Sequence, residues 1–214
     1  MPELPDVEVY REALERHVVG HRLEAARLAS PFVLRSVEPP LAAAVGRDVV
    51  GAERLGKRLV LGLDGGLFAV VHLMIAGRLR WKRRGASERA RGVLVVFDFE
   101  HGSLVLTEAG KRRRASLHLV AGRAALAEHD PGGLDVRSAT PAAFAERLQA
   151  ESRTLKRALC DPHVLDGIGN AYSDEILHAA RLSPFRHTTA LDDAEMDVLV
   201  GAIREVLAGW TLPR

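Results

Sequence analysis

The spacing of the hydrophobic residues changes past the middle of the chain, and this change limits the folds that the chain can adopt. Between residues 22 and 120, short apolar runs of strand length alternate with turn-forming residues. From residue 140 onward, apolar residues recur at the intervals of three and four that place them on one face of a helix. The sequence therefore predicts an α+β fold, with an N-terminal antiparallel β-sandwich followed by an α-helical domain.

Individual strands can be predicted from the apolar runs and from the turns between them. The expected strands are 47–55, 58–63, 67–73, 93–99 and 103–107. Asp64-Gly65-Gly66 separates the second of these runs from the third, and such residues tolerate the positive φ angles of hairpin turns. Glu100-His101-Gly102 predicts another hairpin between the last two runs.

Helices are expected at the start of the chain and in its C-terminal part. A leading helix should run from about Asp6 to Gly20, with its apolar residues at helical spacing. Thr140-Pro141 is an N-cap followed by proline at the first helical position. Asp192 and Glu195 form a capping-box pattern before a final helix. Two shorter helices are expected near 154–159 and 171–181.

The segment between the two kinds of periodicity has the composition of a linker. It contains Gly122 and the turn-forming run Asp130-Pro131-Gly132-Gly133. The expected organisation is therefore a β-sandwich domain over residues 1–120, a linker over 121–139 and a helical domain over 140–214.

Composition limits the class of protein. The chain has 214 residues, 47% of them hydrophobic, which is enough for one large domain or two small ones. Its net charge is +2, so a surface that binds nucleic acid must come from local clustering of basic residues. Cys160 is the only cysteine, which excludes an intrachain disulfide and a multi-cysteine zinc site in this sequence. Without a long apolar run or a signal peptide, we expect a soluble cytoplasmic protein.

The N-terminus carries residues that are suited to amine chemistry. An initiator Met1 before proline is normally removed, which would leave Pro2 with a free secondary amine that titrates at roughly 7.7–8.0. Such an amine can attack a carbonyl or a sugar aldehyde and form an iminium, and the neighbouring Glu3 supplies a carboxylate beside it. If Met1 stays in place, the Pro2 nitrogen is an amide and has no nucleophilic lone pair.

Further motifs follow in a fixed order. They are Met1-Pro2-Glu3-Leu4-Pro5-Asp6-Val7 at the N-terminus, Gly56-Lys57, His72-Leu73-Met74-Ile75-Ala76-Gly77-Arg78-Leu79-Arg80, and Gly167-Ile168-Gly169-Asn170-Ala171-Tyr172. In this order and spacing, they resemble the formamidopyrimidine-DNA glycosylase / endonuclease VIII family of bifunctional DNA glycosylases and AP lyases. The resemblance extends over essentially all of the sequence.

The resemblance implies a base-excision repair enzyme that acts as a monomer in the bacterial cytoplasm, at the nucleoid. It would bind double-stranded DNA that contains damaged bases or abasic sites, and flip the lesion out of the stack. Pro2 would attack C1′ and form a Schiff base, Glu3 would protonate the sugar ring oxygen, and Lys57 would hold a phosphate during β/δ elimination. The β-sandwich domain would then be catalytic, and the helical domain would contain a DNA-binding helix–two-turn–helix motif.

The resemblance also implies DNA-binding residues. Met74 would fill the gap that the flipped nucleotide leaves, although a methionine on a strand is otherwise more often a core residue. Asn170 would bind a phosphate together with backbone N–H groups that Gly167 and Gly169 expose, and Lys156 would bind the backbone nearby. An arginine for the orphaned base could be Arg112 or Arg113. Two basic segments predict a DNA-facing edge: Arg78, Arg80, Lys82, Arg83 and Arg84, and Lys111–Arg114.

The sequence departs from the family pattern in several places. The loop that follows Leu106 lacks the family's phenylalanine wedge. The four cysteines of the family's C-terminal zinc finger are also missing, and the lesion-capping loop with them, so we expect no cofactor in this chain and weak DNA binding. The finger could have been trimmed or lost.

His17 and His21 have metal-ligand spacing but no third ligand, so no metal site is predicted. The alternative function is a non-catalytic protein that binds damaged or abasic DNA on the same scaffold.

Overall fold

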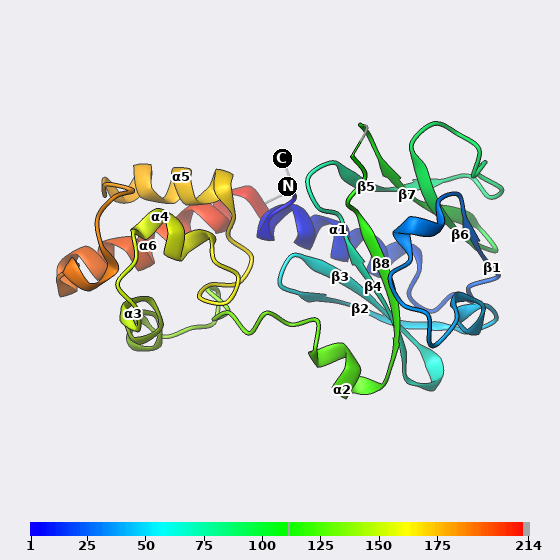
Figure 1. Ribbon diagram of the computed structural model, residues 1–214, viewed down its shortest axis with the longest axis horizontal. Coiled ribbons are helices and arrows are strands. Elements are labelled where there is room, and N and C mark those ends of the chain that lie inside the picture. Colours follow the sequence, from blue (N-terminus) through cyan, green and yellow to red (C-terminus); the bar gives the residue numbers. More distant parts are fainter. Residues whose placement is uncertain (111, 212–214) are drawn as a thin grey trace. The chain divides into compact units, whose positions relative to one another are not determined.

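The computed structural model describes residues 1–110 and 112–211, shown in Figure 1. They form two compact units. The first contains Met1–Pro2 and Val7–His129, and the second contains Glu3–Asp6 and the chain from Asp130 onward. Four residues near the N-terminus thus belong to the unit that the C-terminal part of the chain builds.

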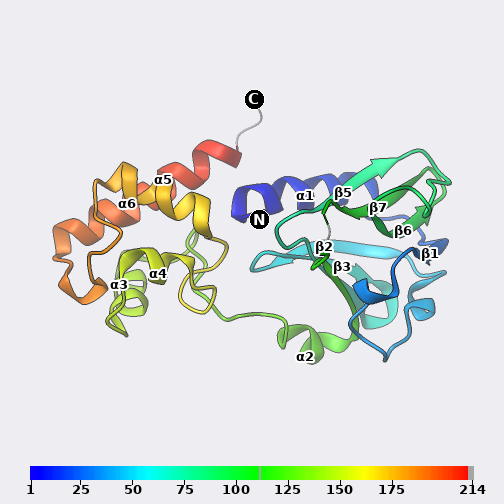
Figure 2. The same ribbon diagram turned by 45° about the horizontal axis from the view of Figure 1, so that its top comes forward.

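The first unit is a sandwich of two four-stranded antiparallel sheets, with strand orders β1-β6-β7-β5 and β2-β3-β4-β8 (Figure 2). The strands are β1 (Ala25–Leu28), β2 (Val49–Leu55), β3 (Arg58–Leu63), β4 (Leu67–His72), β5 (Gly77–Lys82), β6 (Val93–Phe99), β7 (Gly102–Glu108) and β8 (Ser116–Ala121). The five strands expected from the apolar runs are all present. The expected hairpin at Asp64-Gly65-Gly66 is present too, because Leu63 pairs with Leu67 across it.

Successive side chains along each strand point to opposite faces of the sheet, and those on the inner faces form the sandwich core. On β3, Leu59 and Leu61 belong to the large core between the sheets, whereas Val60 points to the opposite face. There Val60 packs with Phe68 and with Leu126 of helix α2 (Gly122–Ala127). The expected linker 121–139 therefore contains a short helix that covers the outer face of one sheet. Its single buried leucine gave too weak a periodic signal to predict it.

Helix α1 (Leu4–His17) begins two residues earlier than expected. The Glu3 backbone N–H donates to the Asp6 carboxylate over 3.0 Å, so Asp6 supports the first turn from inside the helix instead of starting it. Val7, Leu14 and Val18 enter the sandwich core, as their spacing predicts.

The second unit consists of four α-helices around their own core. They are α3 (Pro141–Gln149), α4 (Leu155–Cys160), α5 (Asn170–Ala180) and α6 (Asp193–Thr211). Short 3-10 turns occur at Pro31–Val33, Leu41–Ala44 and Asp64–Gly66 in the first unit and at Thr188–Ala190 in the second. The core includes Leu155, Ile168, Ile176 and Leu199, and also Leu4 from the N-terminal segment. The architecture is the expected α+β fold.

The helix ends in this unit follow the chemistry of their sequence. Thr140 caps α3 by accepting the Ala143 N–H over 3.2 Å. Asp192 and Glu195 form a reciprocal capping box before α6, with N–H to carboxylate distances of 2.8 and 3.2 Å. Helix α5 ends where Arg181 adopts a left-handed conformation at φ 55°. No helix within residues 1–110 and 112–211 combines the length and hydropathy needed to cross a lipid bilayer.

A group of histidines lies beside helix α2. His72 and His118 share the sheet face of Val60, and the rings of His118 and His129 are 4.7 Å apart between centroids. The Arg58 guanidinium donates to the His129 carbonyl over 2.8 Å. Burial, reinforced by the charge of Arg58, lowers the pKa of His72 from 6.5 to about 4. The pKa values of His118 and His129 are lowered mainly by burial too.

These pKa shifts predict that the protein becomes less stable as the pH falls. Below pH 6.5 the unfolded chain binds protons that folded His72 does not bind until about pH 4, so the free energy of unfolding decreases across this window. Because solvent screens part of the effect, His72 should contribute at most about 1 kcal/mol per pH unit. Urea unfolding at several pH values should show a shallower acid slope for His72→Gln.

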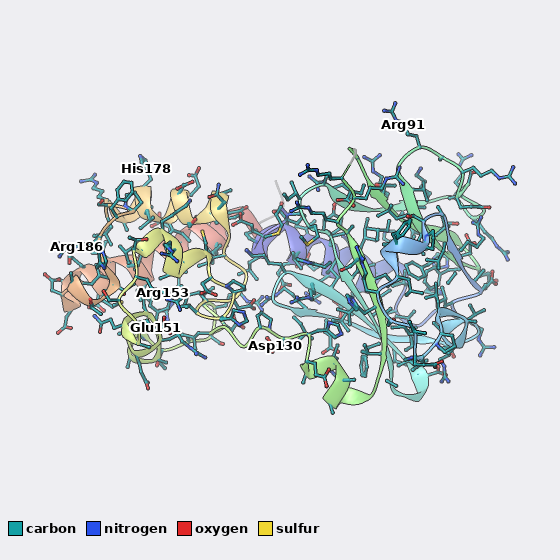
Figure 3. All side chains as sticks on the ribbon, viewed as in Figure 1. Arg91, Asp130, Glu151, Arg153, His178 and Arg186 are labelled. Carbon is teal, nitrogen blue, oxygen red and sulfur yellow. The ribbon has the colours of Figure 1, made fainter. Side chains whose placement is uncertain are left out.

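The matched control is His178→Gln, which changes an exposed histidine on α5 (Figure 3). If both variants keep the wild-type pH slope, His72 is not the source of the acid sensitivity.

Candidate active site and nucleic-acid interface

The Glu3 side chain is buried at the N-terminus of helix α5. It is 3% exposed, and its carboxylate accepts N–H bonds from Gly169 at 2.6 Å, Ala171 at 2.9 Å and Tyr172 at 3.2 Å. The first N–H groups of a helix have no partner within the helix, and Gly169 has no side chain to cap them. Glu3 therefore serves as the cap of a helix that is more than 160 residues away in sequence.

The backbone next to Glu3 is held as firmly as its side chain. The Leu4 N–H donates to the Gly167 carbonyl over 2.9 Å, and the Glu3 N–H donates to Asp6. Pro2 is buried and precedes this fixed segment by one peptide bond, while Met1 is 46% exposed. Pro2 is therefore joined directly to a backbone segment that hydrogen bonds hold in place.

Gly167 is required by packing. Its φ is +82°, and a Cβ at this position would lie 2.7 Å from the Cβ of Leu4. N–H groups of this loop were expected at a phosphate; in the structure the Gly169 N–H donates to Glu3. This glycine-rich loop thus binds the N-terminal segment of its own chain.

Tyr172 belongs to the same site, although it was not among the expected site residues. Burial, together with the nearby carboxylates of Asp6 and Glu3, raises its pKa to about 12. The phenol therefore stays protonated at neutral pH beside the Glu3 carboxylate. Its place two residues after Asn170 in the glycine loop motif was the signal that could have identified it.

Asn170 and Lys156, both expected to bind DNA, lie together. Asn170 is exposed at the first residue of α5, and its carbonyl accepts a bond from the Lys156 Nζ over 2.7 Å. The same Nζ lies 2.5 Å from the Asp174 carboxylate. Lys156 thus supports the start of α5, and Asp174 neutralises part of its charge.

Lys57 lies in the tight turn between β2 and β3, next to Gly56 at φ 59°. Arg54 holds this turn, because its guanidinium donates to the Gly56 carbonyl over 2.6 Å. The same guanidinium bonds at 3.2 Å to Glu8 of helix α1, which is 8% exposed. The half-buried Lys57 therefore stands on a turn that is fixed to the first helix.

The connection between β4 and β5 carries apolar side chains at its tip. Met74 is half-buried and has a φ of 53°, a conformation that non-glycine residues seldom adopt. Its neighbour Ile75 is 62% exposed, although it is a large hydrophobic residue. Of these two residues, only Met74 was expected to fill the gap left by a flipped nucleotide. An apolar residue in a tight turn, without a strand to bury it, was the signal for Ile75.

Arg112 and Arg113 are both exposed on the loop that follows β7. The loop is anchored by Glu108, whose carboxylate accepts the N–H groups of Arg114 and Ala115 at 2.8 and 2.9 Å. Arg113 lines a cavity of about 560 Å³, and Arg112 is not among the residues that line it. Lys111, part of the expected basic segment, lies outside the described residues.

The possible metal ligands do not converge. No group of three His, Cys, Asp or Glu side chains that could hold a metal ion occurs in residues 1–110 and 112–211. His17 stacks on Trp81 at 4.9 Å, and His21 packs against His101 at 4.1 Å. The Cys160 sulfur lies 3.1 Å from the Ser173 hydroxyl. One cysteine does not fit the four-cysteine site of a zinc finger.

Both units match described families. Residues 1–117 match the formamidopyrimidine-DNA glycosylase N-terminal domain, and residues 132–209 match the formamidopyrimidine-DNA glycosylase H2TH domain. The formamidopyrimidine-DNA glycosylase of Carboxydothermus hydrogenoformans is 32% identical, over 97% of this chain and 76% of its own. That of Chloroflexus aurantiacus is 36% identical, over 97% of this chain and 75% of its own.

Solved structures share the fold. The Lactococcus lactis Fpg in complex with DNA containing an abasic site gives a TM-score of 0.89 at 24% identity, covering 98% of this chain and 78% of that one. MutM in complex with DNA containing carbocyclic 8-oxo-G gives 0.88 at 24% identity, covering 97% of this chain and 79% of that one.

The contact between Gly167 and Leu4 predicts the effect of a single methyl group. Gly167→Ala should lower the free energy of unfolding by about 1–3 kcal/mol, because the new Cβ meets Leu4 and the positive φ strains alanine. Gly201→Ala in helix α6 is the matched control. A Cβ there meets nothing within 4 Å, so alanine should stabilise the helix by about 0.5–1 kcal/mol. Chemical denaturation measures both, and equal changes would contradict the packing role of Gly167.

Proposed function

Because the chain belongs to the formamidopyrimidine-DNA glycosylase family, we propose that it removes oxidised bases from double-stranded DNA and cleaves the strand at the resulting abasic site. The observation that carries the proposal is the attachment of Pro2 to Glu3, whose carboxylate is fixed by three N–H bonds at the start of α5. A nucleophile and a proton donor are thus adjacent in sequence and anchored in space.

Removal of Met1 gives Pro2 the free amine that the reaction needs. Attack of its nitrogen on C1′ of the damaged nucleotide breaks the bond between C1′ and the base, which leaves with the bonding electrons and takes up a proton. Glu3 protonates the sugar ring oxygen, the ring opens, and the nitrogen and C1′ form an iminium.

Strand cleavage follows from the iminium. It acidifies the C2′ proton, whose loss breaks the bond from C3′ to its phosphate, and a second elimination breaks the bond at C5′. Water then hydrolyses the iminium and frees Pro2. Lys57 neutralises a phosphate next to the lesion, and Asn170 and Lys156 position the backbone from the helical unit. We propose no cofactor and no metal ion for these steps.

The apolar tip between β4 and β5 enters the gap that the flipped nucleotide leaves. Met74 remains a candidate for this role, but the exposed Ile75 is the better placed of the two, because its side chain is already outside the core. The partner of the orphaned base is Arg112 or Arg113. The enzyme acts as a monomer, on chromosomal DNA in the bacterial cytoplasm.

Covalent trapping tests the proposed chemistry. The intact mass of the purified chain establishes whether Met1 has been removed. With Met1 absent, borohydride and an abasic-site duplex should give a stable protein–DNA adduct, because reduction of the iminium makes the bond permanent. Pro2→Gly should reduce the adduct strongly, since a primary amine replaces the proline ring nitrogen.

Lys57→Gln is the control, since it keeps the nucleophile and should still form an adduct while cleaving the strand more slowly. If Met1 is absent and abasic DNA is bound without any adduct, the lyase assignment fails. The chain would then be a non-catalytic binder of damaged DNA.

Two alanine variants distinguish the candidates for the wedge. Ile75→Ala should weaken binding to a duplex with an abasic site by roughly tenfold, because the smaller side chain no longer fills the gap in the stack. Met74→Ala should have a smaller effect on binding. Val50→Ala, at another 62% exposed residue of the sandwich, is the control and should bind like the wild type. Fluorescence anisotropy measures all three, and a larger loss for Met74→Ala would assign the wedge to that residue.

A further inference from the structure

We infer that the outer face of sheet β1-β6-β7-β5 carries an additional contact site for the phosphate backbone of DNA, next to the loop that supplies the proposed partner of the orphaned base. The site is a groove of about 560 Å³. It is lined by four basic side chains, which we call the cationic groove residues: Arg80, Lys82, Arg91 and Arg113. The choice of DNA as the partner rests on the proposed function; the groove itself does not.

The edge strand β5 supplies the first two cations. Its residues alternate between buried and exposed, so Leu79 faces the core while Arg80 and Lys82 face outward. Arg80 pairs across the ladder with Val105, which is fully buried under the connection between β5 and β6. The two basic side chains therefore stand beside a covered apolar patch, on a rigid strand.

Arg91 comes from the connection between β5 and β6, and this connection is fixed to the sheet. Arg27 on β1 donates to the Ala86 carbonyl at 2.8 Å, pairs with Glu88, and bonds to Asp98 at 2.8 Å. Arg91 projects outward from the connection (Figure 3). The third cation is thus held over the same face as the first two.

Arg113 comes from the loop after β7, which Glu108 anchors through the N–H groups of Arg114 and Ala115. The Glu108 backbone N–H donates to the Gly92 carbonyl over 2.8 Å, which joins this loop to the connection that carries Arg91. Three segments of the chain therefore present their cations on one preformed surface.

The cationic groove residues have no ion-pair partner among the described residues. Other arginines of this unit are paired, such as Arg22 with Asp48 and Arg84 with Glu24. The one carboxylate that lines the groove, Glu108, is 2% exposed and bonded to backbone N–H groups. Unpaired cations at close quarters repel one another, so a bound anion would stabilise their arrangement.

The remaining lining residues indicate what kind of anion fits. They are Ala90, Gly92, Val93, Thr107, Ala109 and Gly110. None of them is aromatic, so the groove offers no surface on which a base could stack. An open groove with separate cations suits successive phosphates of a DNA backbone, which carry no sequence information.

The test compares DNA binding of the full chain as a function of salt. Lys82→Gln/Arg91→Gln should weaken binding to lesion-free and lesion-containing duplexes alike, by roughly tenfold or more at 0.1 M salt. The slope of log K against log salt should become shallower by about 2, because two phosphate contacts are lost. Arg16→Gln/Arg35→Gln removes the same charge from exposed side chains outside the groove and should change the slope far less.

Single-turnover excision at low salt separates this inference from the proposed function. If the wild type excises a lesion and the groove variant has the salt slope of the control variant, the groove inference is wrong and the enzyme assignment stands. If the wild type does not excise but the groove variant still loses affinity for lesion-free DNA, the groove stands and the enzyme assignment fails.

Discussion

The contact between the Glu3 carboxylate and the first N–H groups of helix α5 is the interaction on which the site depends. It satisfies donors that Gly169 cannot cap, and it fixes the residue that follows Pro2. Leu4 extends the same attachment into the apolar core of the helical unit. One carboxylate thus combines a structural role with the catalytic role proposed for it, and a change at residue 3 would affect both.

Local patterns predicted most of the fold. The apolar runs predicted both ends of β3 and β6 correctly, and the pattern of Asp192 and Glu195 predicted the cap of α6. These features depend on residues that are close together in the sequence. Helix α2 was not predicted, since its burial depends on a sheet face that only tertiary pairing creates. The early start of α1 depends in the same way on a loop far along the chain.

The site was predicted as a set of residues and not as a set of contacts. Sequence motifs brought Glu3, Asn170 and Lys156 to attention, but spacing along the chain cannot show which groups satisfy one another. The bond from the Gly169 N–H to Glu3 is such a contact, because it joins two residues that lie far apart in the sequence. Ile75 was missed because apolar residues in turns are ordinarily read as belonging to the nearest strand.

The assignment of Glu3–Asp6 to the unit formed by the C-terminal part of the chain has a consequence for synthesis. These residues leave the ribosome well before the donors that receive Glu3, which are made more than 160 residues later. Until then the segment has no partner for its carboxylate and no core for Leu4. Residues 3–6 are therefore fixed only after the chain through α5 has been made and has folded, so the site cannot form on a shorter nascent chain.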